Sequence, residues 1–173
     1  FMAETTKVLS PEKKVLISDP SAGCSLADSI TGEDVKELKR QYPGVPVVTY
    51  VNTTAETKAE VDICCTSGNA IKIIESIESD KILFVPDRFL CRNMQDQTDK
   101  ELIEWSKGSC EVHELFTVES IKEFRAAHPG LVVIAHPECP RDIVIESDFS
   151  GSTADMINFV DGKRPKKILM VTE

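Results

Sequence analysis

The chain has 173 residues, of which 41% are hydrophobic and 28% are charged, proportions that are ordinary for a globular protein. Its net charge of −9 argues against broad binding to nucleic acid, which depends on basic patches. Because no apolar run approaches the roughly 20 residues of a membrane-spanning helix and no secretory signal is visible, we expect a cytoplasmic protein without membrane contacts.

Helical and strand-like segments alternate along the whole sequence. Hydrophobic periodicity, capping residues and Pro-Gly stops predict a helix over residues 2–9, a strand over 14–18, a helix over 31–42 and a strand over 45–51. Next come a short helix over 53–60, a strand over 62–65, an amphipathic helix through Ile71, Ile74 and Ile77, and a strand over 82–85. A helix over 89–95 and a strand over 102–105 follow. The sequence then predicts a helix over 117–127, a strand over 131–135, a helix over 140–146, a strand over 148–149, a helix over 151–160 and a strand over 168–171.

This alternation predicts an α/β protein of repeated three-layer α/β/α units with parallel sheets and right-handed crossovers. An internal repeat supports the prediction, because an offset of 86 residues aligns residues 33–87 with residues 119–173 without a gap. Identical residues at equivalent positions include Pro43 and Pro129, Gly44 and Gly130, Asp62 and Asp148, and the Lys-Ile-Leu runs that begin at Lys81 and Lys167.

The same register suggests how the chain divides into domains. We expect residues 24–106 to form a second α/β domain and residues 107–173 a third, preceded in residues 1–23 by the tail of a truncated first domain. Both ends of the sequence look cut, since the last apolar strand has nothing after it. We therefore expect a fragment of a longer protein.

The repeat also matches two thiols and, at other equal positions, pairs of unequal polar residues, each after an apolar run. The pairs are Cys24 with Cys110, Tyr50 with His136, Asn52 with Glu138, and Ser67 with Thr153. Ligands of parallel sheets bind outside the carboxyl ends of the strands, so we favour a site shared between the units. Duplication for packing alone remains open, although it does not explain the matched thiols.

The two matched thiols suggest ligands arranged symmetrically around one metal centre. Four thiolates usually hold an iron–sulfur cluster, so a third unit with a third Cys would leave one iron open to water or substrate. The alternative is that Cys24 and Cys110 are ordinary loop thiols. His113 lies three residues after Cys110, and this thiol and imidazole could together bind metal or carry out acid–base chemistry.

The remaining candidate residues also have structural interpretations. Ser67 and the pair Ser152-Thr153 precede helices, where they could cap the helix or bind an anion. A lone Tyr or His after a strand is more often packed than catalytic. His136-Pro137-Glu138 is less easily dismissed, because Pro fixes a turn between an imidazole and a carboxylate. Cys64 and Cys65 lie in a predicted strand and are expected to be packed small hydrophobes.

Several stretches resemble the quinolinate synthase (NadA) family of NAD biosynthesis. They are FMAETTKVLSP, the loop around Cys24-Ser25-Leu26, VVTYVNTTAETKAEVD, TSGNA, GSCEVHELF, AHPECP and GSTADMI. These stretches cover nearly the whole chain in the family's order, so the resemblance is specific.

The resemblance implies three pseudo-symmetric α/β domains, in a pseudo-threefold arrangement, around one [4Fe-4S] cluster that three Cys hold. It implies an enzyme that condenses iminosuccinate (iminoaspartate) with dihydroxyacetone phosphate to give quinolinate, phosphate and water. It also implies a functional link to L-aspartate oxidase. The family's third Cys and its N-terminal substrate-binding residues have no counterpart in this sequence, so activity of the chain alone is not expected.

The resemblance further implies roles for individual residues. Cys24 and Cys110 would be cluster ligands, and the open iron would act as a Lewis acid. The substrate would contact Tyr50, Val51, Asn52, Ser67, His136, Pro137, Glu138 and Thr153. Among these, Tyr50, His136 and Glu138 would be catalytic, with His136 and Glu138 holding substrate and moving protons.

Two other functions stay open from the sequence. One is a non-catalytic α/β module that binds a small anionic metabolite. The other is zinc-dependent hydrolysis at His113, His136 and Glu138. No role follows from the sequence for Cys91 or Cys139.

Overall fold

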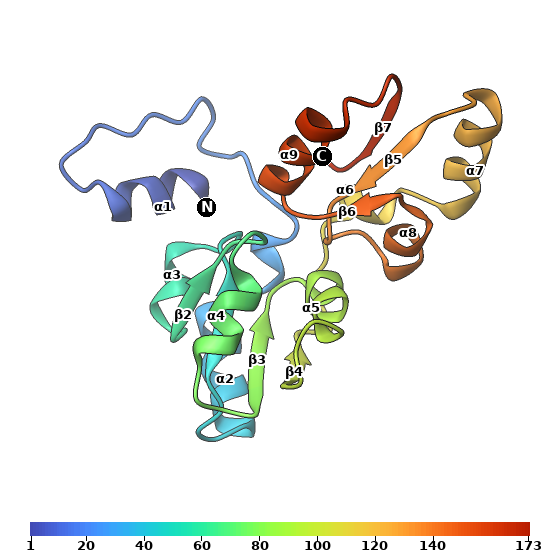
Figure 1. Cartoon of the computed structure of the whole chain (residues 1–173). Coiled ribbons are helices and arrows are strands. Elements are labelled where there is room, and N and C mark those ends of the chain that lie inside the picture. Colours follow the sequence, from blue (N-terminus) through green and yellow to red (C-terminus); the bar gives the residue numbers. More distant parts are fainter.

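The computed structural model describes residues 1–173 and contains two separate β-sheets, one in each half of the chain (Figure 1). The first sheet has four strands in the order β2-β1-β3-β4, and the second has three in the order β6-β5-β7. All neighbouring strands run parallel. The protein is therefore an α/β protein, as predicted. None of its helices combines the length and apolar character that a bilayer crossing requires.

The first half alternates strands and helices in the predicted order. Its strands are β1 (Val47–Tyr50), β2 (Ile63–Cys65), β3 (Lys81–Val85) and β4 (Glu101–Glu104), and its helices are α2 (Gly32–Gln41), α3 (Ala55–Ala59), α4 (Ala70–Ser76) and α5 (Arg88–Gln95). Strand β1 is buried along its whole length because helices cover both faces of the sheet. The predicted capping box starts α2, where Thr31 Oγ1 accepts from Asp34 N and Asp34 accepts from Thr31 N.

The second half repeats this arrangement. It contains α6 (Glu111–Glu114), α7 (Val118–Ala127), β5 (Val132–Ala135), α8 (Arg141–Glu146), β6 (Phe149–Ser150), α9 (Thr153–Lys163) and β7 (Ile168–Val171). The 86-residue offset carries β1, β2 and β3 onto β5, β6 and β7 in the same spatial order. The one-turn helix α6 lies where the sequence predicted only a loop.

The strand predicted over residues 14–18 does not form. Helix α1 (Met2–Leu9) is present as predicted, but the chain then runs to the 3₁₀ helix η1 (Ala27–Ser29) without pairing with either sheet. A strand needs a neighbour for its backbone N–H and C=O groups, and these residues have none. Leu16 is accordingly 83% exposed. The offset carries the segment onto β4, which does have a neighbour, β3.

The core is divided among three clusters of apolar side chains. The largest lies between the first sheet and helices α4 and α5, and includes Phe84, Ile74 and Met94. The buried Cys110 belongs to this cluster, and the partly buried Cys24 packs against it. The other two clusters cover the opposite face of the first sheet and the interior of the second half. Cys24 and Cys110, the candidate ligands of an iron–sulfur cluster, therefore pack on the same group of apolar side chains.

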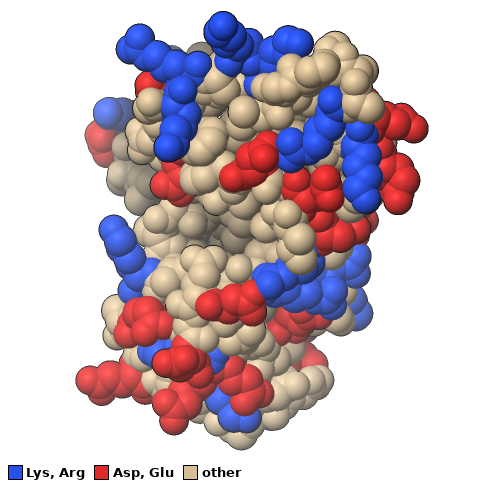
Figure 2. Space-filling view, turned by 45° about the vertical axis from the view of Figure 1, so that its right-hand side comes forward, with Lys and Arg blue, Asp and Glu red and all other residues tan.

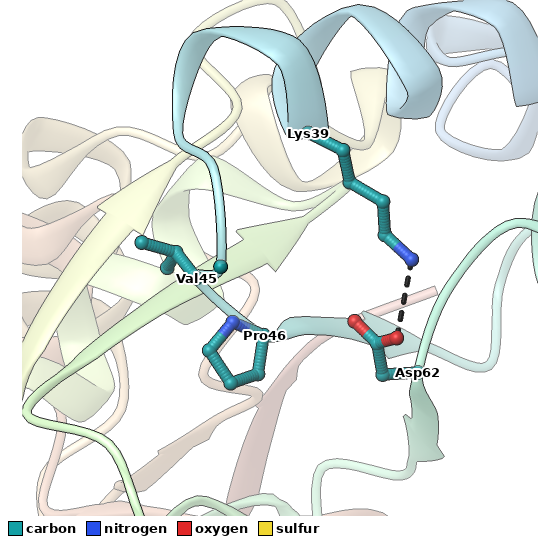
Figure 3. Close-up of a pocket in the computed structure, with 5 residues that line it drawn as sticks. Lys39, Val45, Pro46 and Asp62 are labelled. Carbon is teal, nitrogen blue, oxygen red and sulfur yellow. Dashed lines mark hydrogen bonds and ion pairs between the residues drawn. The ribbon is translucent and has the colours of Figure 1, made fainter.

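The identical pair Asp62 and Asp148 has a structural role. Asp62 accepts a hydrogen bond from Val47 N at 2.8 Å and pairs with Lys39 Nζ at 3.1 Å, beside a shallow pocket (Figure 3). Asp148 accepts from the equivalent backbone N–H at 2.8 Å and pairs with Arg125 at 3.0 Å. Each Asp thus ties the first residues of a central strand to the preceding helix, at the edge of the sheet opposite the candidate site.

Gly108 allows the loop of Cys110 to approach the end of β3. A Cβ atom at this position would lie 1.9 Å from the carbonyl oxygen of Pro86, and backbone cannot yield as a flexible side chain can. We expect Gly108→Ala to lower the free energy of unfolding by about 3 kcal/mol. Gly162→Ala is the control, because nothing lies near its Cβ within helix α9, and it should stabilise by about 0.5–1 kcal/mol. Chemical denaturation of both variants checks this prediction, and a neutral Gly108→Ala would contradict it.

Candidate active site

The turn after β5 carries two buried polar side chains toward the first half of the chain. His136 is 4% exposed and Glu138 is 3% exposed. Glu138 Oε2 lies 3.3 Å from His136 Nδ1, and the backbone N–H of Glu138 donates to the same nitrogen at 3.3 Å. Charged side chains of both signs are scattered over the face in Figure 2, and the recess near the middle of that view is uncharged.

His113 enters the same group from helix α6. It is fully buried, its Nδ1 lies 3.5 Å from Glu138 Oε2, and its ring stacks on that of His136 with the centroids 5.7 Å apart. Burial lowers the pKa of His113, while the negative charge of Glu138 opposes the shift. The ligand atoms of His113, His136 and Glu138 lie within 4.8 Å of one another, so these three residues could also hold a metal ion.

Tyr50 and Ser67 reach this group from the first sheet. Ser67 Oγ lies 3.2 Å from His136 Nε2. Because His136 Nδ1 accepts the N–H of Glu138, the ring proton belongs on Nε2, which then donates to Ser67. The Tyr50 hydroxyl contacts Glu138 and Ser67, and burial followed by the charge of Glu138 raises the pKa of Tyr50. Side chains from the strand ends of both halves therefore meet, as the sequence predicted.

The other proposed substrate contacts lie less deeply. Val51 already uses its backbone N–H to bond Cys65 O at 2.8 Å, and Asn52 is half-buried with no side-chain hydrogen bond to the chain. Thr153 is exposed in the first turn of α9, and the cap of that helix is Ser152. Ser67 does not cap α4, because the N-cap position belongs to Asn69. Gly68 and Ser152 approach each other closely, which brings the loops of Ser67 and Thr153 together.

The loops of Cys24 and Cys110 lie side by side. Glu111 N donates to Ser25 Oγ at 3.4 Å, and these two residues occupy equivalent positions in the repeat. Burial raises the pKa of the Cys110 thiol, while the N–H groups of His113 and Val112 lower it. Two thiols from neighbouring, equivalent loops beside a buried polar group fit two of the ligands of an iron–sulfur cluster.

The remaining cysteines differ from this pair. Burial raises the pKa of Cys65, Cys91 and Cys139 to about 12 each, so they remain thiols. Cys139 Sγ donates to Val171 O at 3.4 Å, which assigns it to packing beside the site. The expectation that Cys64 is packed was wrong, because its side chain is on the exposed face of β2.

Asp87 is a buried carboxyl group that the sequence analysis missed. Its Oδ1 accepts from Leu90 N at 2.6 Å as the N-cap of α5, and its Oδ2 has no partner. Burial, followed by the charge of Glu138, raises the pKa of Asp87 to about 8. Its position two residues after β3, at the carboxyl end of a central strand, is the signal that could have identified it.

The raised pKa of Asp87 predicts a specific pH dependence of stability. An unfolded Asp loses its proton near pH 4, so the stability of the wild type should fall as the pH rises from about 4 to about 8. Asp87→Asn removes this loss and can still cap α5. Its Tm should match the wild type near pH 4 and exceed it by several degrees at pH 8, while the exposed Asp161→Asn shows no such trend. Calorimetry across this range would contradict the prediction if the difference in Tm stayed constant.

Comparison with known proteins shows the family of the chain. A model of the NadA family, described as quinolinate synthetase A protein, matches residues 1–173. The chain is 58% identical over 173 residues to Quinolinate synthase 2 of Mesorhizobium japonicum and 57% identical over 173 residues to the quinolinate synthase of Agrobacterium fabrum. All of this chain is aligned, but only 53% and 50% of the two relatives, so it spans about half the length of the curated relatives it matches. The chain belongs to the quinolinate synthetase A (NadA) family.

Proposed function

We propose that this chain forms part of a quinolinate synthase that condenses iminosuccinate with dihydroxyacetone phosphate to quinolinate, phosphate and water. Membership of the family supports this reaction, since the curated relatives are named quinolinate synthases. The observation that carries the proposal is the buried carboxylate of Glu138, which lies between two imidazoles and close to Tyr50. Closing a pyridine ring requires several proton transfers, and positioned carboxylates and imidazoles perform them well.

The hydrogen bonds of the site suggest how the protons move. Glu138 Oε1 is buried without a partner, so it is free to accept a proton from bound substrate. His113 is neutral at physiological pH because burial lowers its pKa, and it can accept that proton in turn. Tyr50 keeps its proton because its pKa is raised, so it serves as a hydrogen-bond donor and not as a base. The burial of these groups excludes water from the reacting atoms.

The thiols and the outer polar residues complete the proposed site. Cys24 and Cys110 would hold two corners of a [4Fe-4S] cluster. When bound, a cluster with an open iron supplies a Lewis acid that polarises a carbonyl or hydroxyl oxygen. Asn52, Ser67 and Thr153 would bind carboxylate or phosphate oxygens, which suits the free amide of Asn52 and the exposed hydroxyl of Thr153.

A second function is favoured by one observation, the close approach of the ligand atoms of His113, His136 and Glu138. Two imidazoles and a carboxylate are a common ligand set of catalytic zinc, which would make the protein a hydrolase. Metal analysis separates the two functions. Stoichiometric zinc without iron would support hydrolysis, and iron with sulfide would support the synthase.

The cluster proposal predicts the effect of replacing each thiol. In a full-length family member that contains this chain, Cys24→Ser and Cys110→Ser should each abolish the brown colour and visible absorbance after anaerobic reconstitution, because Ser is a poor ligand of iron. Cys64→Ser is the control, since that thiol is exposed and far less suited to a closed site. Undiminished absorbance in both Ser variants would refute the cluster assignment.

The proton-transfer proposal predicts a different result for Glu138. Glu138→Gln keeps the size of the side chain but removes the base, so turnover should fall about 100-fold or more while the cluster absorbance remains. Steady-state rates of quinolinate formation measure this loss. The exposed Glu123→Gln on α7 is the matched control. Wild-type rates in Glu138→Gln would mean that Glu138 is not the base.

A further inference from the structure

A single buried amide joins the two halves of the chain at the turn that carries Glu138. Asn93 lies on α5 in the first half and is 7% exposed. Its Nδ2 donates to the carbonyl oxygens of Pro137 at 2.8 Å and Cys139 at 2.9 Å, both in the second half. The two acceptors therefore flank Glu138 on either side.

The orientation of this amide follows from its partners. Both acceptors are carbonyl oxygens, so the NH₂ group of Asn93 has to face them. Its Oδ1 is then left buried without a hydrogen bond. The amide thus satisfies two backbone acceptors of the second half and leaves one acceptor of its own without a partner.

The contact has a direct consequence for Glu138. The bond to Pro137 O holds the peptide unit that precedes Glu138, and the bond to Cys139 O holds the peptide unit that follows Cys139, so the turn is fixed on both sides of Glu138. Pro137 restricts the backbone of the same turn. A Glu side chain is flexible, but a fixed backbone restricts where its carboxylate can lie. In the structure, Glu138 Oε2 lies 3.3 Å from His136 Nδ1 and 3.5 Å from His113 Nδ1.

A second amide on α5 shows that this geometry is specific to Asn93. Gln95 also makes two hydrogen bonds to the backbone, donating to Lys100 O at 2.8 Å and accepting from Leu102 N at 2.9 Å. Those bonds stay within the first half, at the start of β4. The two amides thus make equal numbers of bonds from one helix, but only Asn93 reaches the turn of Glu138.

We propose that Asn93 is a positioning residue, which holds the turn of Pro137 and Cys139 so that Glu138 meets His113 and His136. Because Asn93 lies in the first half and its acceptors lie in the second, the docking of the two halves would determine where the Glu138 carboxylate lies relative to the two imidazoles. The kinetic consequence rests on the function proposed above, whereas the structural consequence does not.

The kinetic test compares Asn93→Leu with Gln95→Leu in a full-length family member that contains this chain and its cluster. In Asn93→Leu, kcat should fall about 10- to 100-fold with KM within about threefold of the wild type, because misplaced catalytic groups lower turnover more than binding. The cluster absorbance should not change. In Gln95→Leu, kcat should stay within about twofold. Equal losses in the two variants would overturn the proposal.

A double variant tests whether Asn93 acts through Glu138. Adding Asn93→Leu to Glu138→Gln should lower kcat by less than about twofold further, since the group that Asn93 positions has already lost its function. If the two losses multiplied in full, Asn93 would act independently of Glu138, and the proposal would be wrong.

Hydrogen exchange tests the structural part without any assay of function. The amides of Glu138 and Cys139 should exchange about tenfold faster in Asn93→Leu than in the wild type, and at the wild-type rate in Gln95→Leu. Unchanged exchange in Asn93→Leu would overturn the proposal even if activity fell. If the wild type made no quinolinate, the proposed function would fail while this comparison still decided the role of Asn93. If Asn93→Leu did not fold, Asn93→Ala removes the same two donors.

Discussion

The structure depends on the burial of the Glu138 carboxylate where the carboxyl ends of two parallel sheets meet. A buried carboxylate is costly unless other groups compensate its charge, and here they come from separate elements. The Tyr50 hydroxyl comes from the first sheet and the neutral His113 imidazole from α6, and both can donate to the carboxylate, whereas His136 Nδ1 already accepts the N–H of Glu138. The two halves therefore have to dock in one register before the charge is compensated. Asp87 adds a second buried carboxyl group, and because its pKa is raised to about 8, folding at neutral pH requires it to take up a proton, which lowers stability.

The duplicated scaffold separates residues that maintain the fold from residues that are suited to chemistry. Asp62 and Asp148 are identical and make the same contacts, since each joins the start of a central strand to a helix. At the opposite ends of those strands the copies diverge, with Tyr50 in one and His136 in the other. Because equivalent strand ends face each other across the two halves, one repeated fold yields a single site with two chemically different sides.

Helix α5 links the parts of this site mechanically. The loop of Cys110 contacts its N-terminus, where Arg88 N donates to Gly108 O at 2.9 Å. Asp87 caps the same end of the helix, and Asn93 one turn and a half further along reaches the second half. Helix α5 therefore contacts three parts of the proposed site, namely the loop of Cys110, the buried Asp87 and the turn of Glu138. We expect a displacement of α5 at one of these contacts to move the side chains at the other two, because close-packed interiors transmit displacements.

The sequence by itself determined the alternation of helices and strands, the repeat, the capping box of α2 and the convergence of strand-end residues, since local periodicity and strand direction decide these features. Only the tertiary structure decided which neighbours each residue meets. Residues 14–18 have a strand-like pattern but no adjacent strand, and Cys64 lies on an exposed face. Ser67 bonds an imidazole in the other half where capping was one expectation, and Asp87 is buried beside a second acid. Pairing, burial and charge depend on groups far apart along the chain, and local patterns carry no information about those groups until the chain has folded.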